Sequence, residues 1–434
     1  MNELSRRYLP PGDDADAPSR PRPRLSGPFG VLDVGTTKIV CIVGRVESDA
    51  SVRVLGFGWQ RGRGVRSGGI VDIEEAERAI RAAVGQAENE ADQRLKSITV
   101  NLSCGAPESR LYNVQWPVSG RAVTEADVRR VLLEGRGRAA AQAPGREIIH
   151  ALPLGFAVDD AEGIDDPRGL HCDLLSGRVH VVDAQRSALM NLSACVHRCD
   201  LEVAELVSAP MAAGMATLVE DERQLGATVI DMGGGGTGMA VFAEGQLLHT
   251  AHLPLGGMHV TNDIARVLSA PIGDAERLKT VYGSVHASPD DENELLTVPL
   301  VGEEEHQFSR VPRSMVVNII KPRLEETFEL AKERLEGAGL GRAAGVRVVL
   351  TGGASQLNGA RELASRILGR QVRLGRPAGL RGLPASAGGP AFATAVGLLA
   401  WAAGTGRTFA DLDLDADRPG GMFRRIVNFL RDRV

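Results

Sequence analysis

Two glycine-rich turns that each begin at an aspartate carry the clearest chemical signal in this sequence. In the segment 228–242, TVIDMGGGGTGMAVF, an apolar run ends at Asp231, glycines fill positions 233–236, and an apolar run then resumes. A turn without side chains lets several backbone N–H groups approach a polyphosphate. Because the carboxylate of Asp231 would repel phosphate, it predicts a Mg²⁺ ion between them, bound through water. One such turn by itself is more typical of an ordinary β-turn.

Two further turns in the chain complement the first one. The segment 29–43, FGVLDVGTTKIVCIV, repeats the order of apolar run, Asp-X-Gly turn and apolar run, which indicates an internal duplication. The segment 346–359, VRVVLTGGASQLNG, is typical of a strand, a Gly-Gly turn and the start of a helix. Two phosphate hairpins that face each other, with the Gly-Gly turn beside the nucleoside, would form an ATP clamp between duplicated lobes. The candidate ATP-binding residues of the three turns are Asp33, Gly35, Thr36, Thr37, Lys38, Asp231, Gly233, Gly234, Gly235, Gly236, Thr237, Gly352 and Gly353, and the candidate metal ligands are Asp33 and Asp231.

At these turns the chain resembles the actin, Hsp70 and sugar-kinase superfamily. The motifs DVGTTK, DMGGGGTG and TGGASQLNG are similar to its first phosphate loop, its second phosphate loop and its adenosine loop. Within the superfamily the chain is similar to the FtsA family of bacterial cell-division proteins, over about residues 28–402 and the last fourteen residues. The resemblance implies a bilobal, actin-like α/β fold with duplicated ribonuclease-H-like lobes, an inserted α+β subdomain called 1C, and a C-terminal amphipathic helix.

The local sequence patterns and the resemblance together predict a division of the chain into domains. The helices at 210–218 and 390–402 should cross between the lobes, and their small residues should let them approach closely enough to act as a hinge. A long helix at 314–336 should be interrupted near Pro322, and the acidic segment 289–305 should be an irregular loop. The expected parts are a disordered tail at 1–27, lobe 1A at 28–96, 173–207 and 378–402, subdomain 1C at 97–172, lobe 2A at 208–240 and 311–377, subdomain 2B at 241–310, a linker at 403–420 and a membrane-targeting helix at 421–434.

Composition restricts the possible partners and the compartment. The formal net charge of −5 excludes the basic signature of a nucleic-acid-binding protein, and no apolar run is long enough to span a membrane. No secretory signal precedes the first strand, and five cysteines favour a reducing cytosol over a disulfide framework. Cys195, His197 and Cys199 lie close together, but no second Cys/His pair follows at a useful spacing, so buried thiols are favoured over a zinc site.

Two departures from the family pattern predict weak or absent ATP hydrolysis. The pattern is DxGGGTxD, and this chain has Gly236 in place of the threonine and Gly238 in place of the final aspartate; Thr237 could substitute for the lost hydroxyl. In addition, the segment 207–218 contains no Asp, Glu, Gln or His that could orient the attacking water. No catalytic residue is therefore assigned.

The resemblance also implies roles for two pairs of residues in subdomain 2B. Glu276 and Lys279 lie on one helical face, which in the family reaches the ribose and adenine, whereas the alternative is an exposed ion pair. Arg310 and Arg313 could bind the acidic C-terminal peptide of FtsZ, or could instead pair with the chain's own acidic loop. The resemblance further implies that subdomain 1C takes part in self-association and contacts later division proteins. The alternative is that it is an insert without a function.

The segment 421–434, GMFRRIVNFLRDRV, predicts a short basic amphipathic helix. Such a helix suits the anionic surface of the inner membrane, and the alternative is that it docks on its own domain. One copy should bind lipid reversibly and a filament of copies should bind by avidity. The candidate membrane-binding residues are Met422, Phe423, Arg424, Arg425, Ile426, Val427, Phe429 and Leu430.

These features predict a nucleotide-binding adaptor that polymerises on the cytoplasmic membrane, anchors the FtsZ ring and recruits later division proteins. Two alternatives share the ATP-binding loops. A sugar-kinase-type phosphotransferase would need a catalytic aspartate, for which the sequence offers no convincing candidate. A pilus-assembly adaptor of the same fold would not need the basic terminal helix.

Overall fold

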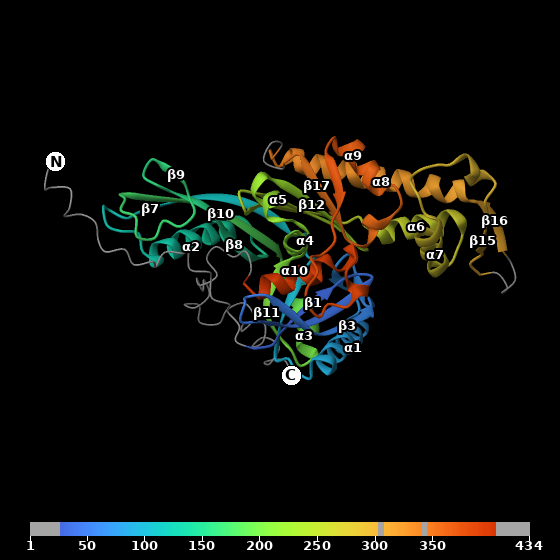
Figure 1. Cartoon of the computed structure of the whole chain (residues 1–434), viewed down its shortest axis with the longest axis horizontal. Helices are drawn as coiled ribbons and strands as arrows, with labels where there is room; N and C mark the ends of the chain where they lie inside the picture. Colours follow the sequence, from blue (N-terminus) through green and yellow to red (C-terminus); the bar gives the residue numbers. More distant parts are fainter. Residues whose placement is uncertain (1–26, 303–307, 341–344, 405–434) are drawn as a thin grey trace, which may run out of the picture.

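The computed structural model describes residues 27–302, 308–340 and 345–404. In Figure 1 the chain has two lobes at its centre, an insert that projects to one side, and a small helical subdomain on the other side. The predicted tail at 1–27 lies outside the described residues except for its last residue, as does nearly all of the linker at 403–420 and the whole of the predicted helix at 421–434. Across the described residues, no helix is both apolar enough and long enough to cross a bilayer.

The two central lobes contain five-stranded sheets with the same topology. In each sheet the first strand and the two strands that follow it in sequence pair antiparallel. Two later strands then add in parallel on the opposite side of the first strand. The first sheet has the order β3-β2-β1-β6-β11, with β1 at Phe29–Val34, β2 at Lys38–Val46, β3 at Val52–Arg61, β6 at Ser97–Leu102 and β11 at Glu202–Ser208. The second has the order β14-β13-β12-β17-β18, with β12 at Ala227–Met232, β13 at Thr237–Ala243, β14 at Gln246–Leu253, β17 at Arg347–Thr351 and β18 at Gln371–Leu374. The duplication predicted from the two aspartate turns is therefore confirmed.

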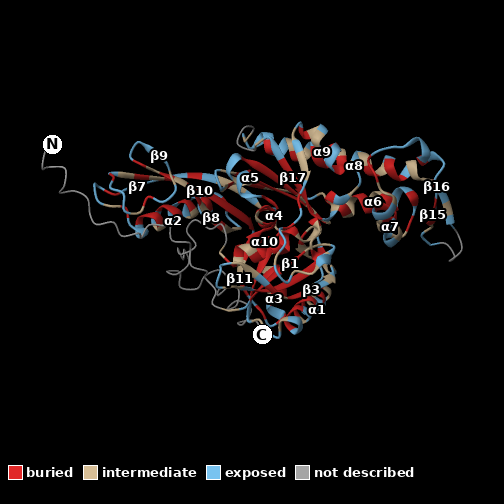
Figure 2. Cartoon of the chain, in the orientation of Figure 1, coloured by how far each residue is buried: buried red, intermediate tan, exposed pale blue. Residues whose placement is uncertain are grey.

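Two short apolar helices lie between the sheets, where the sequence placed the hinge. They are α4 (Ala209–Thr217) and α10 (Ala393–Ala402), and nearly all their side chains are buried. A single core packs around them from both lobes, with Val31 and Ile42 on one side and Val229 and Ala240 on the other. The burial of these residues appears as the red centre of Figure 2. Because the lobes share this core, movement of one lobe relative to the other would require side chains around α4 and α10 to repack.

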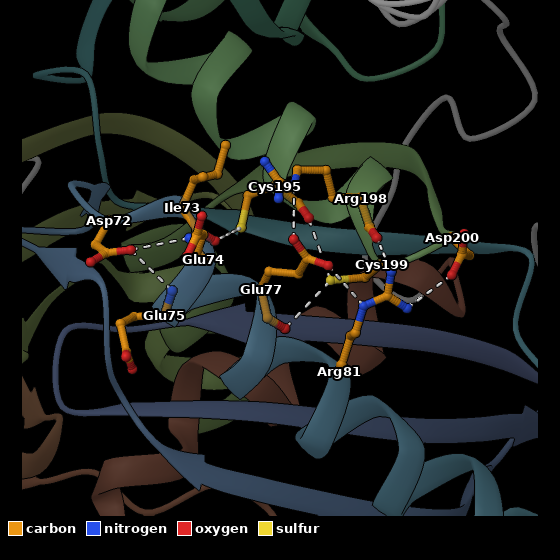
Figure 3. A network of polar contacts seen from close by, with 10 residues as sticks. All are labelled: Asp72, Ile73, Glu74, Glu75, Glu77, Arg81, Cys195, Arg198, Cys199 and Asp200. Carbon is orange, nitrogen blue, oxygen red and sulfur yellow. Dashed lines mark hydrogen bonds and ion pairs between the residues drawn. The ribbon is translucent and has the colours of Figure 1, made fainter. Parts of the chain in front are cut away.

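The outer face of the first lobe is covered by α1 (Ile73–Ala91) and α3 (Arg186–Arg198). Asp72 caps α1 by accepting bonds from the backbone N–H groups of its first turn. Figure 3 shows how the two helices are joined: Glu77 of α1 pairs with Arg198 of α3 at 2.7 Å, and also with Arg81 of its own helix at 3.0 Å. The thiol of Cys199 donates to the carbonyl of Glu77. All five cysteines are buried and free, which confirms the prediction of buried thiols.

The insert forms a four-stranded antiparallel sheet with one covering helix. Its strand order is β7-β10-β8-β9, and the helix α2 (Glu125–Gln142) begins after its N-cap residue, Thr124. The predicted boundaries of 97–172 differ from this sheet, because β6 pairs with β1 in the first lobe. In addition, the segment 174–185, which was expected in lobe 1A, pairs with β7 and β8. The strands of the insert are β7 at Glu108–Pro117, β8 at Arg146–Val158, β9 at Ala161–Ile164 and β10 at Leu174–Gln185.

The small subdomain and its neighbouring helices differ from expectation at two places. The long helix α8 runs without interruption from Arg313 to Gly337, because a single proline removes one backbone hydrogen bond without ending the helix. The acidic segment expected to be irregular contains a 3₁₀ turn at Pro289–Glu292 and the strand β15 (Leu295–Pro299), which pairs with β16 (Phe308–Pro312). The remaining elements are β4 at Val65–Arg66, β5 at Gly69–Ile70, α5 at Glu220–Leu225, α6 at Gly257–Leu268, α7 at Ile272–Tyr282, α9 at Ala360–Leu368 and 3₁₀ turns at Gly353–Gln356, Ala385–Ala387 and Pro390–Phe392.

Candidate functional site

The three glycine-rich turns lie around one cavity between the lobes. The β1–β2 turn lines it from the first lobe, and the β12–β13 turn and the turn after β17 line it from the second. The lining residues that the sequence predicted are Asp33, Gly35, Thr36, Thr37, Lys38, Asp231, Gly233, Gly234, Gly235, Gly236, Gly352 and Gly353. Residues about 200 positions apart are therefore brought together, as the duplication required.

The two hairpin turns are built in the same way and face each other. Each is closed by one backbone hydrogen bond, from Gly35 N to Lys38 O at 3.0 Å and from Gly233 N to Gly236 O at 2.9 Å. A Cβ atom at position 235 would lie 2.2 Å from the hydroxyl of Thr36. The close approach of the two turns therefore requires glycine in the second turn, and it leaves backbone N–H groups at the cavity wall.

Two carboxylates and one ammonium group set the charge of the cavity. Burial raises the pKa of Asp33, and Lys38 partly offsets this rise. Burial also raises the pKa of Asp231 to about 6, as does the charge of Asp33, while a 2.8 Å hydrogen bond from Thr394 and the charge of Lys38 act in the opposite direction. Two carboxylates that disfavour each other's charge form a site whose energy a cation would lower.

The donor set of the cavity fits Mg²⁺ and a phosphate chain. No group of three or more His, Cys, Asp or Glu side chains that could hold a metal occurs among residues 27–302, 308–340 and 345–404. A protein site with one or two carboxylates is typical of Mg²⁺, which completes its shell with water and phosphate oxygens. Asp33 and Asp231 would hold such an ion, and the turn N–H groups and Lys38 would hold the phosphates.

Several residues of the cavity wall were not predicted. They come from other strand ends and from the crossing helices, and no local motif in the sequence distinguishes them. They are Ser67, Gly68, Asn101, Ser103, Ala209, Pro210, Gly238, His252, Ala391 and Thr394. Pro210 and Thr394 lie on α4 and α10, so the prediction that these helices cross between the lobes was the one signal that could have identified them.

Three of the predicted nucleotide-binding residues do not line the cavity. The hydroxyl of Thr237 donates to the carbonyl of Leu255 at 2.7 Å, so it does not replace the threonine missing at 236. Lys279 is 8% exposed and pairs with Glu276 at 2.7 Å, so this pair is not the exposed one that the alternative described. The ammonium group also donates to the carbonyl of Gly257, next to the second turn.

The two arginines predicted to bind a partner have different surroundings. Arg313 pairs with the buried carboxylate of Asp291 at 2.8 Å and with Glu294 at 3.5 Å, which matches the alternative that it pairs with the chain's own acidic segment. Arg310 is exposed on β16. Only Arg310 of the two thus presents its charge to solvent.

Comparisons with known proteins identify the relatives of this chain. The model of the family "Cell division protein FtsA" matches residues 228–397, and that of the "SHS2 domain inserted in FTSA" matches residues 105–183, where the insert lies. The chain is 45% identical to cell division protein FtsA of Agrobacterium fabrum over 409 residues, which cover 92% of this chain and 90% of the relative. It is 35% identical to that of Pseudomonas aeruginosa, over 85% of this chain and 87% of the relative.

Among solved structures, the chain is similar to a PilM-PilN type IV pilus biogenesis complex. The TM-score is 0.62 at 18% identity, and the match covers 86% of this chain and 98% of the solved chain. At this identity the similarity shows a common fold. The architecture is therefore actin-like, with two lobes of the same topology and an inserted subdomain.

Proposed function

Because the chain belongs to the FtsA family of cell division proteins, we propose that it is an ATP-binding protein that assembles on the inner membrane and anchors the FtsZ ring there. Its role in cell division follows from the family, and its actin-like fold agrees with that role. The observation that supports nucleotide binding most strongly is the convergence of three glycine-rich turns and two aspartates on one cavity.

In the proposed complex the cavity holds ATP with Mg²⁺. Asp33 and Asp231 hold the ion through water, and the β1–β2 and β12–β13 turns hold the phosphates from opposite sides. The nucleoside would lie beside Gly352 and Gly353, which line the cavity at the end of β17. Glu276 and Lys279 lie behind the cavity wall and stabilise it indirectly. Lys279 donates to the carbonyl of Gly257, and the N–H of Gly257 donates to the carbonyl of Gly233 in the β12–β13 turn.

We further propose that hydrolysis is slow. The family pattern has an aspartate at the position of Gly238. A Cβ atom there would lie 3.0 Å from the ring of Pro210, so this ring occupies space next to the missing side chain. The cavity wall contributed by α4 consists of Ala209 and Pro210, neither of which has a polar side chain that could orient a water molecule. The bound nucleotide then acts as a switch for assembly.

The proposed partners are the membrane surface, FtsZ and other division proteins, and the charges of this chain suit the first two. The segment 421–434 has the sequence of an amphipathic membrane anchor, and its arginines would lie at anionic headgroups. The exposed Arg310 offers a pairing group for the acidic FtsZ peptide, whereas Arg313 is already paired. Subdomain 1C, the insert of four strands and α2, would serve self-association and contacts with later division proteins.

The membrane part of the proposal predicts the outcome of a flotation experiment. The full chain should float with vesicles that contain anionic lipid, and a chain that ends at Gly404 should not. ATP should increase flotation of the full chain because linked copies bind by avidity. FtsZ should float only when the full chain is present.

Vesicles of neutral lipid provide the control, because the arginines of 421–434 then lose their electrostatic attraction. Equal flotation of the full and shortened chains would contradict the assignment of the anchor. Flotation of the full chain without recruitment of FtsZ would instead contradict the proposed partner.

A further inference from the structure

His252 lies beside Gly236 and Gly238, the two positions at which this chain departs from the family pattern. It lies on β14 directly opposite Gly238, so its side chain is on the same face of the sheet as the side chain that position 238 lacks. Its ring also lies beside the other departure, since a Cβ at Gly236 would be 2.5 Å from the imidazole. The ring therefore fills space that a threonine at 236 would need.

The imidazole of His252 faces the cavity without a protein partner. It lines the cavity, and within the described part of the chain it makes no hydrogen bond. Burial lowers the pKa of His252 to about 4, so at neutral pH the ring is uncharged and offers one N–H donor and one acceptor. A polar group in this position gains a partner only from water or from a ligand.

The strand order places His252 at the end of the cavity away from the nucleoside turn. In the sheet β14-β13-β12-β17-β18, the turn at Gly352 and Gly353 follows β17 on one side of the β12–β13 hairpin, and His252 lies on the other side. A nucleotide with its nucleoside beside Gly353 extends its phosphate chain across this hairpin. Its terminal phosphate then lies on the side of His252.

We propose that His252 donates a hydrogen bond to the terminal phosphate of the bound nucleotide, in place of the side chains absent at 236 and 238, and so favours the triphosphate over the diphosphate. This inference rests on the proposed binding of ATP. It assigns recognition of the nucleotide state to a residue outside the three glycine-rich turns.

The test is calorimetric titration of the full chain with the magnesium complexes of ADP and of AMP-PNP, a triphosphate analogue that resists hydrolysis. Loss of one hydrogen bond to a charged group should weaken AMP-PNP binding to His252→Val about tenfold, with the affinity for ADP changed less than about twofold. The double variant Gly236→Thr, His252→Val should regain the preference, since valine removes the imidazole that a Cβ at 236 would meet most closely and the hydroxyl of threonine supplies a donor. Thermal unfolding of each variant checks that it folds.

A measurement on the unaltered protein keeps the inference testable if the variants do not fold. The imidazole ¹⁵N signals of His252 should shift with AMP-PNP and stay near their free positions with ADP. Unchanged ¹⁵N signals with AMP-PNP, or equal loss of both nucleotides in His252→Val, would overturn the role of His252 while leaving ATP binding intact. Failure of the unaltered chain to bind either nucleotide would overturn the proposed function itself.

Discussion

Replacing Asp231 with asparagine should make the nucleotide-free protein more stable and at the same time abolish its Mg²⁺-dependent binding of ATP. The folded protein holds the Asp231 proton more tightly than the unfolded chain does, because the pKa of Asp231 rises from 3.8 to about 6 on folding. The free energy of unfolding therefore decreases as the pH rises from about 4 to 6, and at pH 7 the full cost of the charge is present. An amide at 231 removes this cost and should add about 1 to 3 kcal/mol at pH 7.

The same substitution removes a ligand of the proposed metal site. ATP with Mg²⁺ at 100 times its dissociation constant should stabilise the unaltered protein by about 2.7 kcal/mol and the variant by far less. Urea unfolding at pH 7 and pH 5, with and without the nucleotide, measures both effects, and the gain from asparagine should be smaller at pH 5. Asp160→Asn, in an exposed turn of the insert, is the matched control and should change neither quantity. A variant that loses stability yet still binds Mg²⁺ and ATP would contradict this view of Asp231.

Replacing Gly397 with alanine should strongly destabilise the protein. The Cβ atom would lie 1.7 Å from the carbonyl oxygen of Ala212, so α4 and α10 would have to move apart. Overpacking of this kind costs about 1 to 3 kcal/mol or more. Because Thr394 on α10 binds Asp231, and Pro210 on α4 lines the cavity, we expect weaker ATP binding as well.

Gly137→Ala is the control for the intrinsic effect of alanine in a helix. Position 137 is exposed in α2, and no atom lies within 4 Å of a Cβ built there. This substitution should stabilise the protein by up to about 1 kcal/mol. If urea unfolding gave the same small gain for Gly397→Ala, the close crossing of the two helices would not be a constraint on the fold.

The sequence predicted the parts of the fold that depend on local patterns. The strand–turn–strand units around Asp33 and Asp231 and the small-residue helices α4 and α10 could be read from apolar periodicity and glycine placement. The boundaries of the insert could not, because the patterns identify β6 and β10 as strands without showing which sheet each one joins. Pro322 was expected to interrupt α8, but tertiary packing on both sides of it keeps the helix intact.

The candidate site was predictable only where glycine and aspartate formed a motif. Thr394 and His252 reach the cavity through the crossing of α10 and the register of β14, which are properties of the folded chain. Lys279 was expected at the nucleoside, yet its buried ammonium group is satisfied by Glu276, Thr261 and Gly257. Helical spacing identified the pair correctly but gave no information on the direction in which it faces.

One nucleotide and one metal ion held between Asp33 and Asp231 are the central feature of the proposed function. Crystals of the full chain grown with ATP and Mn²⁺, which replaces Mg²⁺, test this directly through the anomalous scattering of the metal. We predict one Mn²⁺ peak between the two carboxylates, phosphates between the two hairpin turns, and the nucleoside beside Gly352 and Gly353. A nucleotide bound elsewhere, or Mn²⁺ located away from both aspartates, would contradict the account.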